Sequence, residues 1–336
     1  MVKDLFIKII LKSVKKRWTS NTDQKVLIST NQYFDKKSWI NTISSGSNAD
    51  RTRHWDIVYC KNRFEVYRHF FDADICFLFG YGSFLSKILA ADKVLYFPVL
   101  GLEFLDQRKL PPSYKIEQPP TASITAISEY CLGMAIVLTR NLQSVFLKQL
   151  NRKWDQQRLL GSQFVSVSDM NIGILGVGKV GRSIAQQFKK IGCYVAGCDK
   201  NKNENLAEVD KWYSPNNLAD FLDAADVLII ALSSNAETEQ MIGLKELKML
   251  GSDSFLINIS RGNIIVEKDL IHALKAKIIR GAVIDVFSRE PLPGSSPLYK
   301  LDNVILTPHI SGNINLFIDE IQEDFIAKIS KEPDLN

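Results

Sequence analysis

The stretch from Asn171 to Asp199, NIGILGVGKVGRSIAQQFKKIGCYVAGCD, decides the fold. A short apolar run ends at Gly176, and three glycines there have the spacing G-x-G-x-x-G. A helical pattern follows, and a second apolar run, Tyr194–Ala196, then leads to Asp199. This order predicts a strand, a tight turn, a helix and a second strand, which together form the dinucleotide-binding unit of a doubly wound α/β domain.

Each glycine in this unit has a predicted physical role. Gly176 makes the tight turn, Gly178 lets a pyrophosphate approach the backbone, and Gly181 lets the helix pack closely on the strand. The amides around Lys179 and Val180, at the helix N-terminus, offer donors and a positive dipole end to phosphates. The alternative is a glycine turn with only a structural purpose.

Asp199 predicts which dinucleotide is bound. Its carboxylate is placed to accept hydrogen bonds from both ribose hydroxyls of the adenosine, and its charge would repel a 2′-phosphate. We therefore expect NAD as the cofactor. Lys200, the next residue, keeps NADP open as the alternative.

Composition limits the remaining possibilities. The 336 residues are 46% hydrophobic and 24% charged, as in an ordinary globular protein of two domains. The net charge of +5 permits an anionic substrate and does not indicate nucleic acid. The longest apolar run, Ala225–Leu232, is far shorter than the ~18 residues of a membrane span, so we expect no integral membrane segment. Five cysteines without C-x-x-C spacing and only four histidines predict free thiols, no metal site and a cytoplasmic protein.

Residues 1–24 differ from the rest of the chain. Apolar residues from Leu5 to Trp18 recur at helical spacing, with lysines on the other side. One interpretation of this basic amphipathic extension is a helix that binds a membrane surface or a partner. We favour the other, a helix packed on its own protein or on a second subunit.

Outside the glycine-rich unit, apolar runs alternate with helical patterns, which predicts parallel βαβ units. The predicted strands are 25–29, 57–60, 75–79, 93–97, 170–175, 194–196 and 281–285, and the shorter predicted helices are 34–43 and 64–71. One long helix is predicted over Ile124–Leu150, and a terminal helix over Leu316–Ile329 is predicted to fold back on the first domain. We therefore expect two doubly wound (Rossmann or flavodoxin-like) α/β domains with a cleft between them. Residues 25–120 plus 309–336 would form a substrate domain, and residues 121–308 an NAD-binding domain.

Three segments near the C-terminus resemble the D-isomer-specific 2-hydroxyacid dehydrogenase family. They are FLINISRGNIIVEKDLIHALKAKIIRGAVIDVF from Phe255, SREPLP from Ser288 and NVILTPHISG from Asn303. The resemblance continues more weakly upstream to about residue 25. It implies an enzyme that moves a hydride between nicotinamide and C2 of a small 2-hydroxy or 2-keto acid.

The resemblance assigns catalysis to Arg261, Glu290 and His309. Reduction of a keto acid requires a proton at the carbonyl oxygen, which a histidine can supply and, in the reverse direction, remove. Glu290 would hold the other ring nitrogen and fix the tautomer. Arg261 would bind the substrate carboxylate and polarise the carbonyl. Taken singly, these residues could instead be a solvated loop histidine, a turn acid and a surface cation.

The resemblance also implies further binding residues. Asp285 resembles the acid that accepts from the nicotinamide carboxamide, with a strand-end cap as the alternative. Leu100 and Gly101 match the loop whose amides hold the substrate carboxylate, although the loop lacks the first glycine of the usual Gly-x-Gly. The other implied cofactor contacts are Leu232, Ile259, Ser260, Arg261, His309 and Gly312.

Two other functions stay open. The first is a non-catalytic NADH-sensing protein on the same scaffold, resembling the C-terminal-binding-protein corepressors, which keep the same three residues. The second is a formate or phosphite dehydrogenase, of which the formate branch is disfavoured because it would carry glutamine in place of Glu290. The long helix from Ile124 resembles the family's dimerisation element, which implies a homodimer. The identity of the 2-hydroxy acid is not readable from these motifs.

Overall fold

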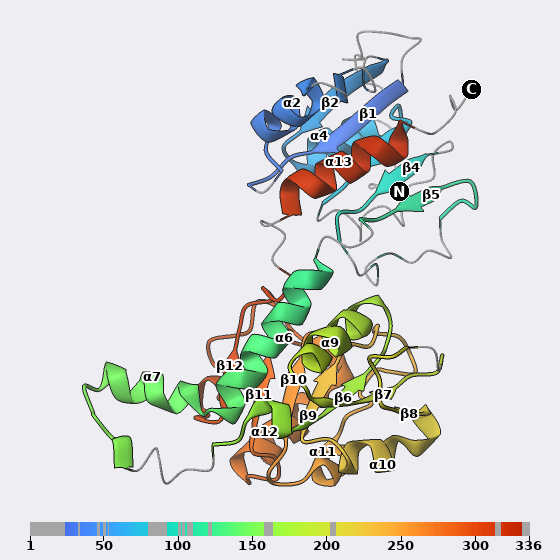
Figure 1. The fold of residues 1–336 in the computed structure, drawn as a ribbon. Coiled ribbons are helices and arrows are strands. Elements are labelled where there is room, and N and C mark those ends of the chain that lie inside the picture. Colours follow the sequence, from blue (N-terminus) through green and yellow to red (C-terminus); the bar gives the residue numbers. More distant parts are fainter. Residues whose placement is uncertain are drawn as a thin grey trace, which may run out of the picture. The chain divides into compact units, whose positions relative to one another are not determined.

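The computed structural model describes residues 24–330 except 33, 46–47, 50–51, 53, 80–92, 100–101, 103–104, 106–109, 120–122, 158–163, 202–205 and 313–316. Nearly all of the N-terminal extension, and both Leu100 and Gly101, therefore lie outside the described residues. The chain divides into two compact units (Figure 1). Unit 1 is Met1–Ala122 with Ile314–Asn336, and unit 2 is Ser123–Asn313.

Unit 1 is a parallel five-stranded sheet with helices on both faces. The strands have the order β2-β1-β3-β4-β5, the order of a flavodoxin-like domain. They are β1 (Gln24–Ser29), β2 (Trp55–Cys60), β3 (Ile75–Phe77), β4 (Val94–Tyr96) and β5 (Lys115–Glu117). Helix α4 (Arg63–Phe70) packs on one face, and helices α2 (Lys36–Ser44) and α13 (Ile318–Ile329) pack on the other. The terminal helix thus belongs to the first unit, as predicted, because Phe325 packs against Trp39 and Phe77.

Unit 2 is a parallel seven-stranded sheet with the order β12-β11-β10-β9-β6-β7-β8. This is a Rossmann arrangement extended by one strand, in which the order reverses between β6 and β9. Its strands are β6 (Asn171–Leu175), β7 (Tyr194–Cys198), β8 (Lys211–Tyr213), β9 (Val227–Ile230), β10 (Phe255–Asn258), β11 (Gly281–Ile284) and β12 (Val304–Leu306). Its α-helices are α6 (Ile124–Thr139), α7 (Leu142–Leu150), α9 (Lys179–Lys190), α10 (Leu218–Asp223), α11 (Leu244–Leu250) and α12 (Glu267–Lys275). Short 3-10 turns include η4 (Gly262–Ile264) and η5 (Pro297–Lys300).

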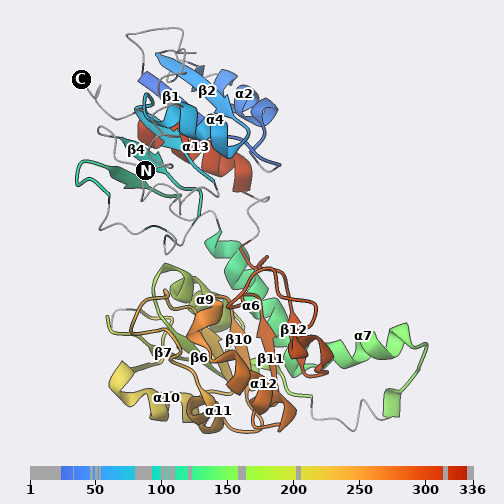
Figure 2. The same ribbon diagram turned by 180° about the vertical axis from the view of Figure 1, so that it is seen from behind.

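Both faces of the second sheet are covered, which explains why its central strands are continuous apolar runs. Helices α6 and α9 lie on one face, and α10, α11 and α12 lie on the other (Figures 1 and 2). Strands β9 and β10 are buried over their whole length, because side chains of alternating direction both enter a core. The predicted fold class, two doubly wound α/β domains, is confirmed.

The prediction of one helix over Ile124–Leu150 was wrong. The chain forms α6 and α7, which are bent by 71°. Asn141 between them has φ +50, a left-handed conformation that ends a right-handed helix. Apolar periodicity continues through this break, so the pattern alone could not locate it. Of the residues that the structure describes, no single helix is long and apolar enough to cross a membrane, and α6 with α7 reaches that length only as a bent pair.

The division into units differs from the predicted boundaries at two places, of which the shift from residue 120 to residue 122 is the smaller. Residues 309–313 were assigned to the first domain, whereas the structure groups them with unit 2. The reason is local: the backbone N–H of His309 donates to the carbonyl of Asp285, at the end of β11, over 2.9 Å. The predicted strands also omitted β5, β8 and β12, which have only three residues each, and the four-residue strands β9 and β10.

Candidate active site

The glycine turn connects β6 to α9 at the point where the strand order reverses. Gly176 has φ +98, and a Cβ there would lie 2.8 Å from the backbone of both Ala231 and Leu232. A Cβ on Gly181 would lie 2.1 Å from the carbonyl oxygen of Gly176. These two glycines are therefore required by the turn and by helix packing.

Gly178 is different from its two neighbours in the motif. It is exposed, has an ordinary φ of −74, and a Cβ built on it would meet nothing within 4 Å. Neither the backbone conformation nor packing inside the protein explains a glycine here. The missing side chain leaves bare backbone at the N-terminus of α9, where amide donors and the positive end of the helix dipole are available to an anion.

Asp199 follows β7, the strand next to the glycine turn. Its two carboxylate oxygens accept from the backbone N–H groups of Val177 and Asn201, each over 2.8 Å. One bond ties the carboxylate to the glycine turn, and each oxygen retains a lone pair for a further donor. Lys200 forms an ion pair with Glu237.

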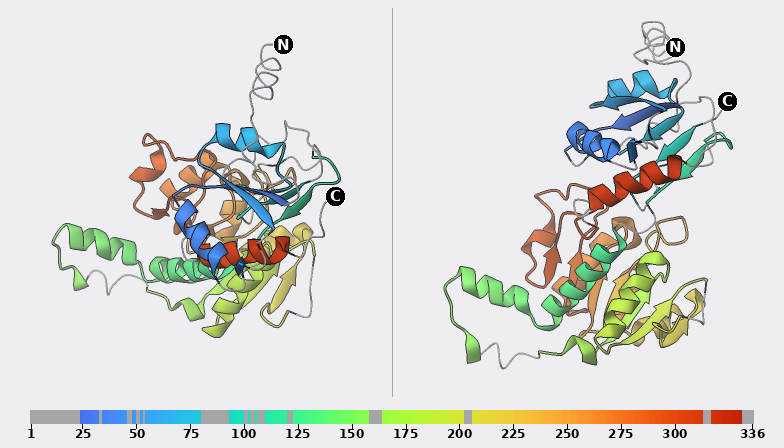
Figure 3. Two further views of the ribbon diagram at one scale, coloured as in Figure 1. Left: turned by 90° about the horizontal axis from the view of Figure 1, so that it is seen from above. Right: turned by 45° about the horizontal axis from the view of Figure 1, so that its top comes forward.

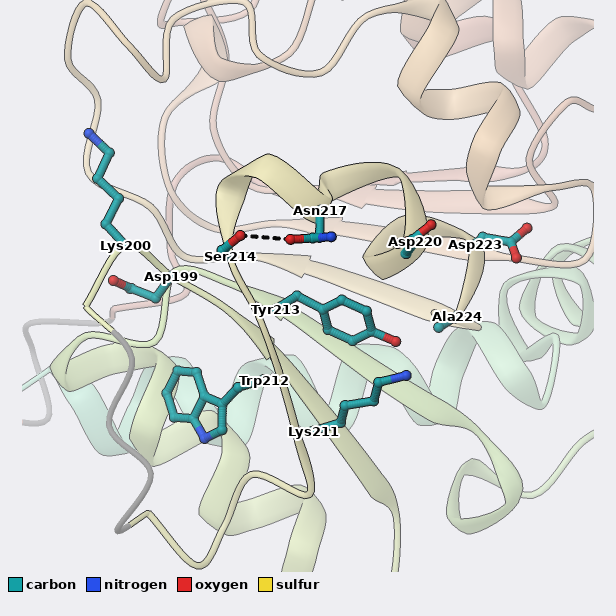
Figure 4. Close-up of a pocket in the computed structure, with 10 residues that line it drawn as sticks. All are labelled: Asp199, Lys200, Lys211, Trp212, Tyr213, Ser214, Asn217, Asp220, Asp223 and Ala224. Atoms are coloured by element: carbon teal, nitrogen blue, oxygen red, sulfur yellow. Dashed lines mark hydrogen bonds between the residues drawn. The ribbon is translucent and has the colours of Figure 1, made fainter.

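A pocket of about 720 Å³ extends from Asp199 along the edge strand β8 (Figure 4). Tyr213 at the end of β8 lies along it, and the hydroxyl of Ser214 donates to the side-chain oxygen of Asn217 over 2.9 Å. The sequence pattern did not indicate these residues, because β8 is too short to show a period. Two consecutive aromatic residues, Trp212 and Tyr213, shortly after the strand-end acid were the only available signal.

Arg261 lies just beyond β10, beside the loop that follows β9. The Ser260 hydroxyl donates to the carbonyl of Leu232, so that the two loops are held together. Nη1 of Arg261 donates to the carbonyl of Ser260 over 2.7 Å, and the amide of Asn258 donates to the carbonyl of Arg261 over 3.1 Å. Ile259 and Ser260 are both buried, which fixes the backbone that carries the guanidinium.

Gly262 connects the Arg261 segment to the Glu290 segment. A Cβ on Gly262 would lie 1.9 Å from the backbone carbon of Phe287 and 2.2 Å from the nitrogen of Ser288. The two chain segments therefore touch through their backbones, and only glycine allows this approach. This close packing brings the Ser-Arg-Gly and Arg-Glu-Pro motifs to the same edge of the sheet.

The structure pairs His309 with Glu290. Nδ1 of the imidazole lies 2.8 Å from Oε2 of the carboxylate, and the other carboxylate oxygen accepts from the N–H of Phe287 over 3.0 Å. Because an ionised carboxylate can only accept, Nδ1 carries the proton, and Nε2 is the nitrogen that can exchange a proton with a substrate. The side chains are 46% and 38% exposed, so the pair is accessible to small molecules in solution.

Asp285 is fully buried at the end of β11. Its carboxylate accepts from the hydroxyl of Thr307 over 2.6 Å and from the backbone N–H groups of Ile310 and Ser311, each over 2.9 Å. This is the strand-end cap considered as the alternative for this residue. A contact with the nicotinamide carboxamide stays a prediction.

The remaining predicted residues have the following places. Lys179 is exposed in the first turn of α9, and Val180 packs partly into the core beside it. A Cβ on Gly312 would lie 3.4 Å from the side chain of Ile127, so the end of the His309 loop rests on α6. Tyr130 and Thr307, which join this helix to the loop, were not singled out from the sequence.

Residues 132–311 match the model of the D-isomer specific 2-hydroxyacid dehydrogenase family, NAD binding domain. This match covers more than half of the 336 residues. The chain belongs to the D-isomer specific 2-hydroxyacid dehydrogenase family, which confirms the resemblance noted in the motifs.

Individual relatives are similar over part of their length. D-3-phosphoglycerate dehydrogenase of Escherichia coli is 30% identical over 64% of this chain and 52% of that protein. Glyoxylate/hydroxypyruvate reductase A of Photorhabdus laumondii is 31% identical over 60% of this chain and 62% of that protein. The match thus spans between half and two thirds of these relatives. A solved D-isomer specific 2-hydroxyacid dehydrogenase family protein from Aeromonas salmonicida superimposes with a TM-score of 0.76 and 25% identity, over 93% of this chain and 97% of that one.

Proposed function

We propose that this protein is an NAD-dependent dehydrogenase that interconverts a small 2-hydroxy acid and its 2-keto acid. One observation carries the proposal: the His309–Glu290 pair and Arg261 lie at the same carboxyl edge of the sheet as the glycine turn. In open parallel sheets this edge is where ligands bind. The bare backbone at Gly178 fits a pyrophosphate, as neither packing nor conformation accounts for that glycine.

Each residue at this edge has a proposed chemical task. Arg261 binds the substrate carboxylate through a planar pair of N–H donors and polarises the keto group. His309 donates a proton from Nε2 to the carbonyl oxygen during reduction and takes it back during oxidation. Glu290 accepts from Nδ1–H, which fixes the tautomer and the orientation of the ring. When bound, the nicotinamide supplies or accepts the hydride.

The proposed nucleotide site extends from the glycine turn to the pocket beside Asp199. Asp199 accepts from the ribose hydroxyls, and its negative charge disfavours the 2′-phosphate of NADP. Lys200 is the residue that favours NADP, and its ion pair with Glu237 reduces that tendency. The other proposed contacts with the cofactor are Lys179, Val180, Leu232, Ile259, Ser260, Asp285 and Gly312. For the substrate, Leu100 and Gly101 are proposed as additional contacts.

A second copy of this chain is the proposed partner of α7. Helix α7 projects away from the rest of unit 2, and every residue in it is at least partly exposed (Figure 3). Phe146 and Leu150 are 55% and 80% exposed, and Trp154 just beyond is 90% exposed. Covering such a surface by a symmetric partner removes apolar area from water. A cytoplasmic protein fits the five free cysteines, all of which are buried.

The proposal is tested with a panel of 2-keto acids, each with NADH and with NADPH. The panel includes glyoxylate, hydroxypyruvate, pyruvate and a phosphorylated keto acid, and His309→Ala is measured beside the wild type. We expect NADH to be preferred and kcat/KM to fall at least ~100-fold in the variant, the low end for a general acid–base. His272→Ala on α12 is the control, because His272 is an exposed histidine on a helix of the same unit.

Two results would contradict the proposal. Equal rates for His309→Ala and wild type would remove this imidazole from the reaction. Tight binding of NADH without turnover of any keto acid in the panel would favour the NADH-sensing protein instead.

A further inference from the structure

One buried residue organises the whole loop that carries the catalytic histidine. The carboxylate of Asp285 accepts from Thr307, Ile310 and Ser311, and its main-chain carbonyl accepts from His309. Four donors on both sides of the imidazole therefore converge on one residue. Capping the end of β11 requires only one hydrogen bond, so the other bonds to Asp285 hold the loop rather than the strand.

The backbone of His309 explains why so many bonds are present. His309 has φ +54, in the left-handed region, which costs about 1–2 kcal/mol for a residue with a side chain. Such a conformation persists only where the surroundings impose it. Packing does not impose it, because the His309 side chain is 46% exposed. The hydrogen bonds to Asp285, together with a bond from the His309 N–H to the carbonyl of Thr307 over 3.0 Å, thus hold the backbone in the conformation that pairs Nδ1 with Glu290.

A tyrosine on α6 completes this arrangement. The Tyr130 hydroxyl lies 2.6 Å from Oγ1 of Thr307, which in turn lies 2.6 Å from the carboxylate of Asp285. Thr307 has one hydroxyl proton and gives it to the carboxylate, so Tyr130 must be the donor to Thr307. Burial raises the pKa of Tyr130 well above its ordinary value, and although the Thr307 hydroxyl lowers it, the Asp285 charge raises it further. Tyr130 therefore remains a protonated donor at any physiological pH.

We propose that Tyr130, Thr307 and Asp285 form a clamp that holds His309 in its left-handed conformation and aims its imidazole at Glu290. Tyr130 and Thr307 are then positioning residues, which act on proton transfer through His309 and touch neither substrate nor cofactor. The clamp also ties the His309 loop to α6, the first helix of unit 2. The expected effect on turnover rests on the proposed function, whereas the expected effect on the His309 tautomer does not depend on any reaction.

The structural consequence is tested by nitrogen NMR of the histidine rings. The protein has only four histidines, and His309→Ala assigns the signal of interest. In wild type the neutral ring should be the Nδ1–H tautomer, because Glu290 accepts from that nitrogen. In Thr307→Val and Tyr130→Phe we expect a mixture with the Nε2–H tautomer, which free imidazole favours. Thr307→Ser keeps the hydroxyl and should restore the wild-type signal.

A matched control separates the clamp from general loss of a buried hydroxyl. Thr139, also in unit 2 at the end of α6, is fully buried and its hydroxyl donates only within its own helix, to the carbonyl of Ile136. Thr139→Val should leave the His309 signal unchanged. An unchanged tautomer in both Thr307→Val and Tyr130→Phe, with the melting temperature retained, would overturn the proposal.

Turnover supplies the second readout. With the keto acid that wild type reduces best, Thr307→Val and Tyr130→Phe should lower kcat about 10- to 100-fold, since misplacement of a catalytic group by about 1 Å has that effect. The Kd for NADH should stay at the wild-type value. A loss of NADH affinity at constant kcat would overturn the positioning role. If wild type reduces no keto acid, the proposed function fails, whereas the NMR result still decides whether the clamp exists.

Discussion

Replacing Gly178 and Gly181 of the glycine turn by alanine, one at a time, separates ligand binding from folding. At Gly178 the added methyl group meets nothing within 4 Å, and φ of −74 suits alanine. Alanine is a poorer N-cap than glycine for α9, which destabilises the folded protein by about 0.5–1 kcal/mol. It also lowers the conformational entropy of the unfolded chain, which stabilises the folded protein by about 0.4–1 kcal/mol, so the two effects offset each other. At Gly181 the methyl group would lie 2.1 Å from the Gly176 carbonyl oxygen, and overpacking of this kind costs about 1–3 kcal/mol.

The two variants should be distinguished by the assay that each affects: Gly181→Ala lowers the melting temperature, and Gly178→Ala weakens NADH binding. In a domain of roughly 150–250 residues, 1 kcal/mol changes Tm by about 2–4 °C, so Gly181→Ala should melt about 2–12 °C lower and Gly178→Ala within about 3 °C of wild type. The Kd for NADH, measured by fluorescence titration, should rise at least tenfold in Gly178→Ala, which corresponds to about 1.4 kcal/mol. Melting is followed by circular dichroism without nucleotide, so that binding does not contribute to Tm.

One outcome would refute this reasoning directly. If Gly178→Ala bound NADH as tightly as wild type, the bare backbone at that position would not be where the pyrophosphate lies. The glycine at position 178 would then not be explained by the approach of a pyrophosphate to the backbone, and the nucleotide site would lose its main structural support.

Three further predictions concern cofactor choice, assembly and pH. Asp199→Ser should raise the ratio of kcat/KM for NADPH to that for NADH at least ~10-fold, because it removes a repelling charge beside Lys200; an unchanged ratio would exclude Asp199 as the selective residue. Leu150→Glu on α7 should convert a dimer into a monomer in analytical ultracentrifugation, whereas Phe64→Glu, at a residue 75% exposed in unit 1, should not. Burial raises the pKa of the Cys76 thiol to about 12 from an ordinary value near 9, so the unfolded chain releases this proton at lower pH than the folded one. Stability should therefore be complete below pH 9 and fall as the pH rises toward 12, and the fall in Tm should be shallower in Cys76→Ala.

The sequence was sufficient for features that depend on local patterns. Strands β1, β3, β4 and β6 are apolar runs bounded by turns, and the glycine spacing after β6 predicted a turn between a strand and a helix. The apolar face of the terminal helix predicted a packed helix, whereas its place in the first unit follows from the contacts of Phe325 with Trp39 and Phe77. Short edge strands such as β8 could not be predicted, since three residues show no period.

The sequence by itself therefore determined the fold class and the glycine turn between β6 and α9, because each depends on residue type and spacing along the chain. The tertiary structure decided the break at Asn141, the backbone contact of Gly262 with Phe287, and the pairing of His309 with Glu290. It alone showed that Asp285 holds the histidine loop through Thr307 and that Tyr130 joins this network. These features depend on which strand ends are neighbours, and the order of strands in a parallel sheet places residues side by side that are far apart in the chain.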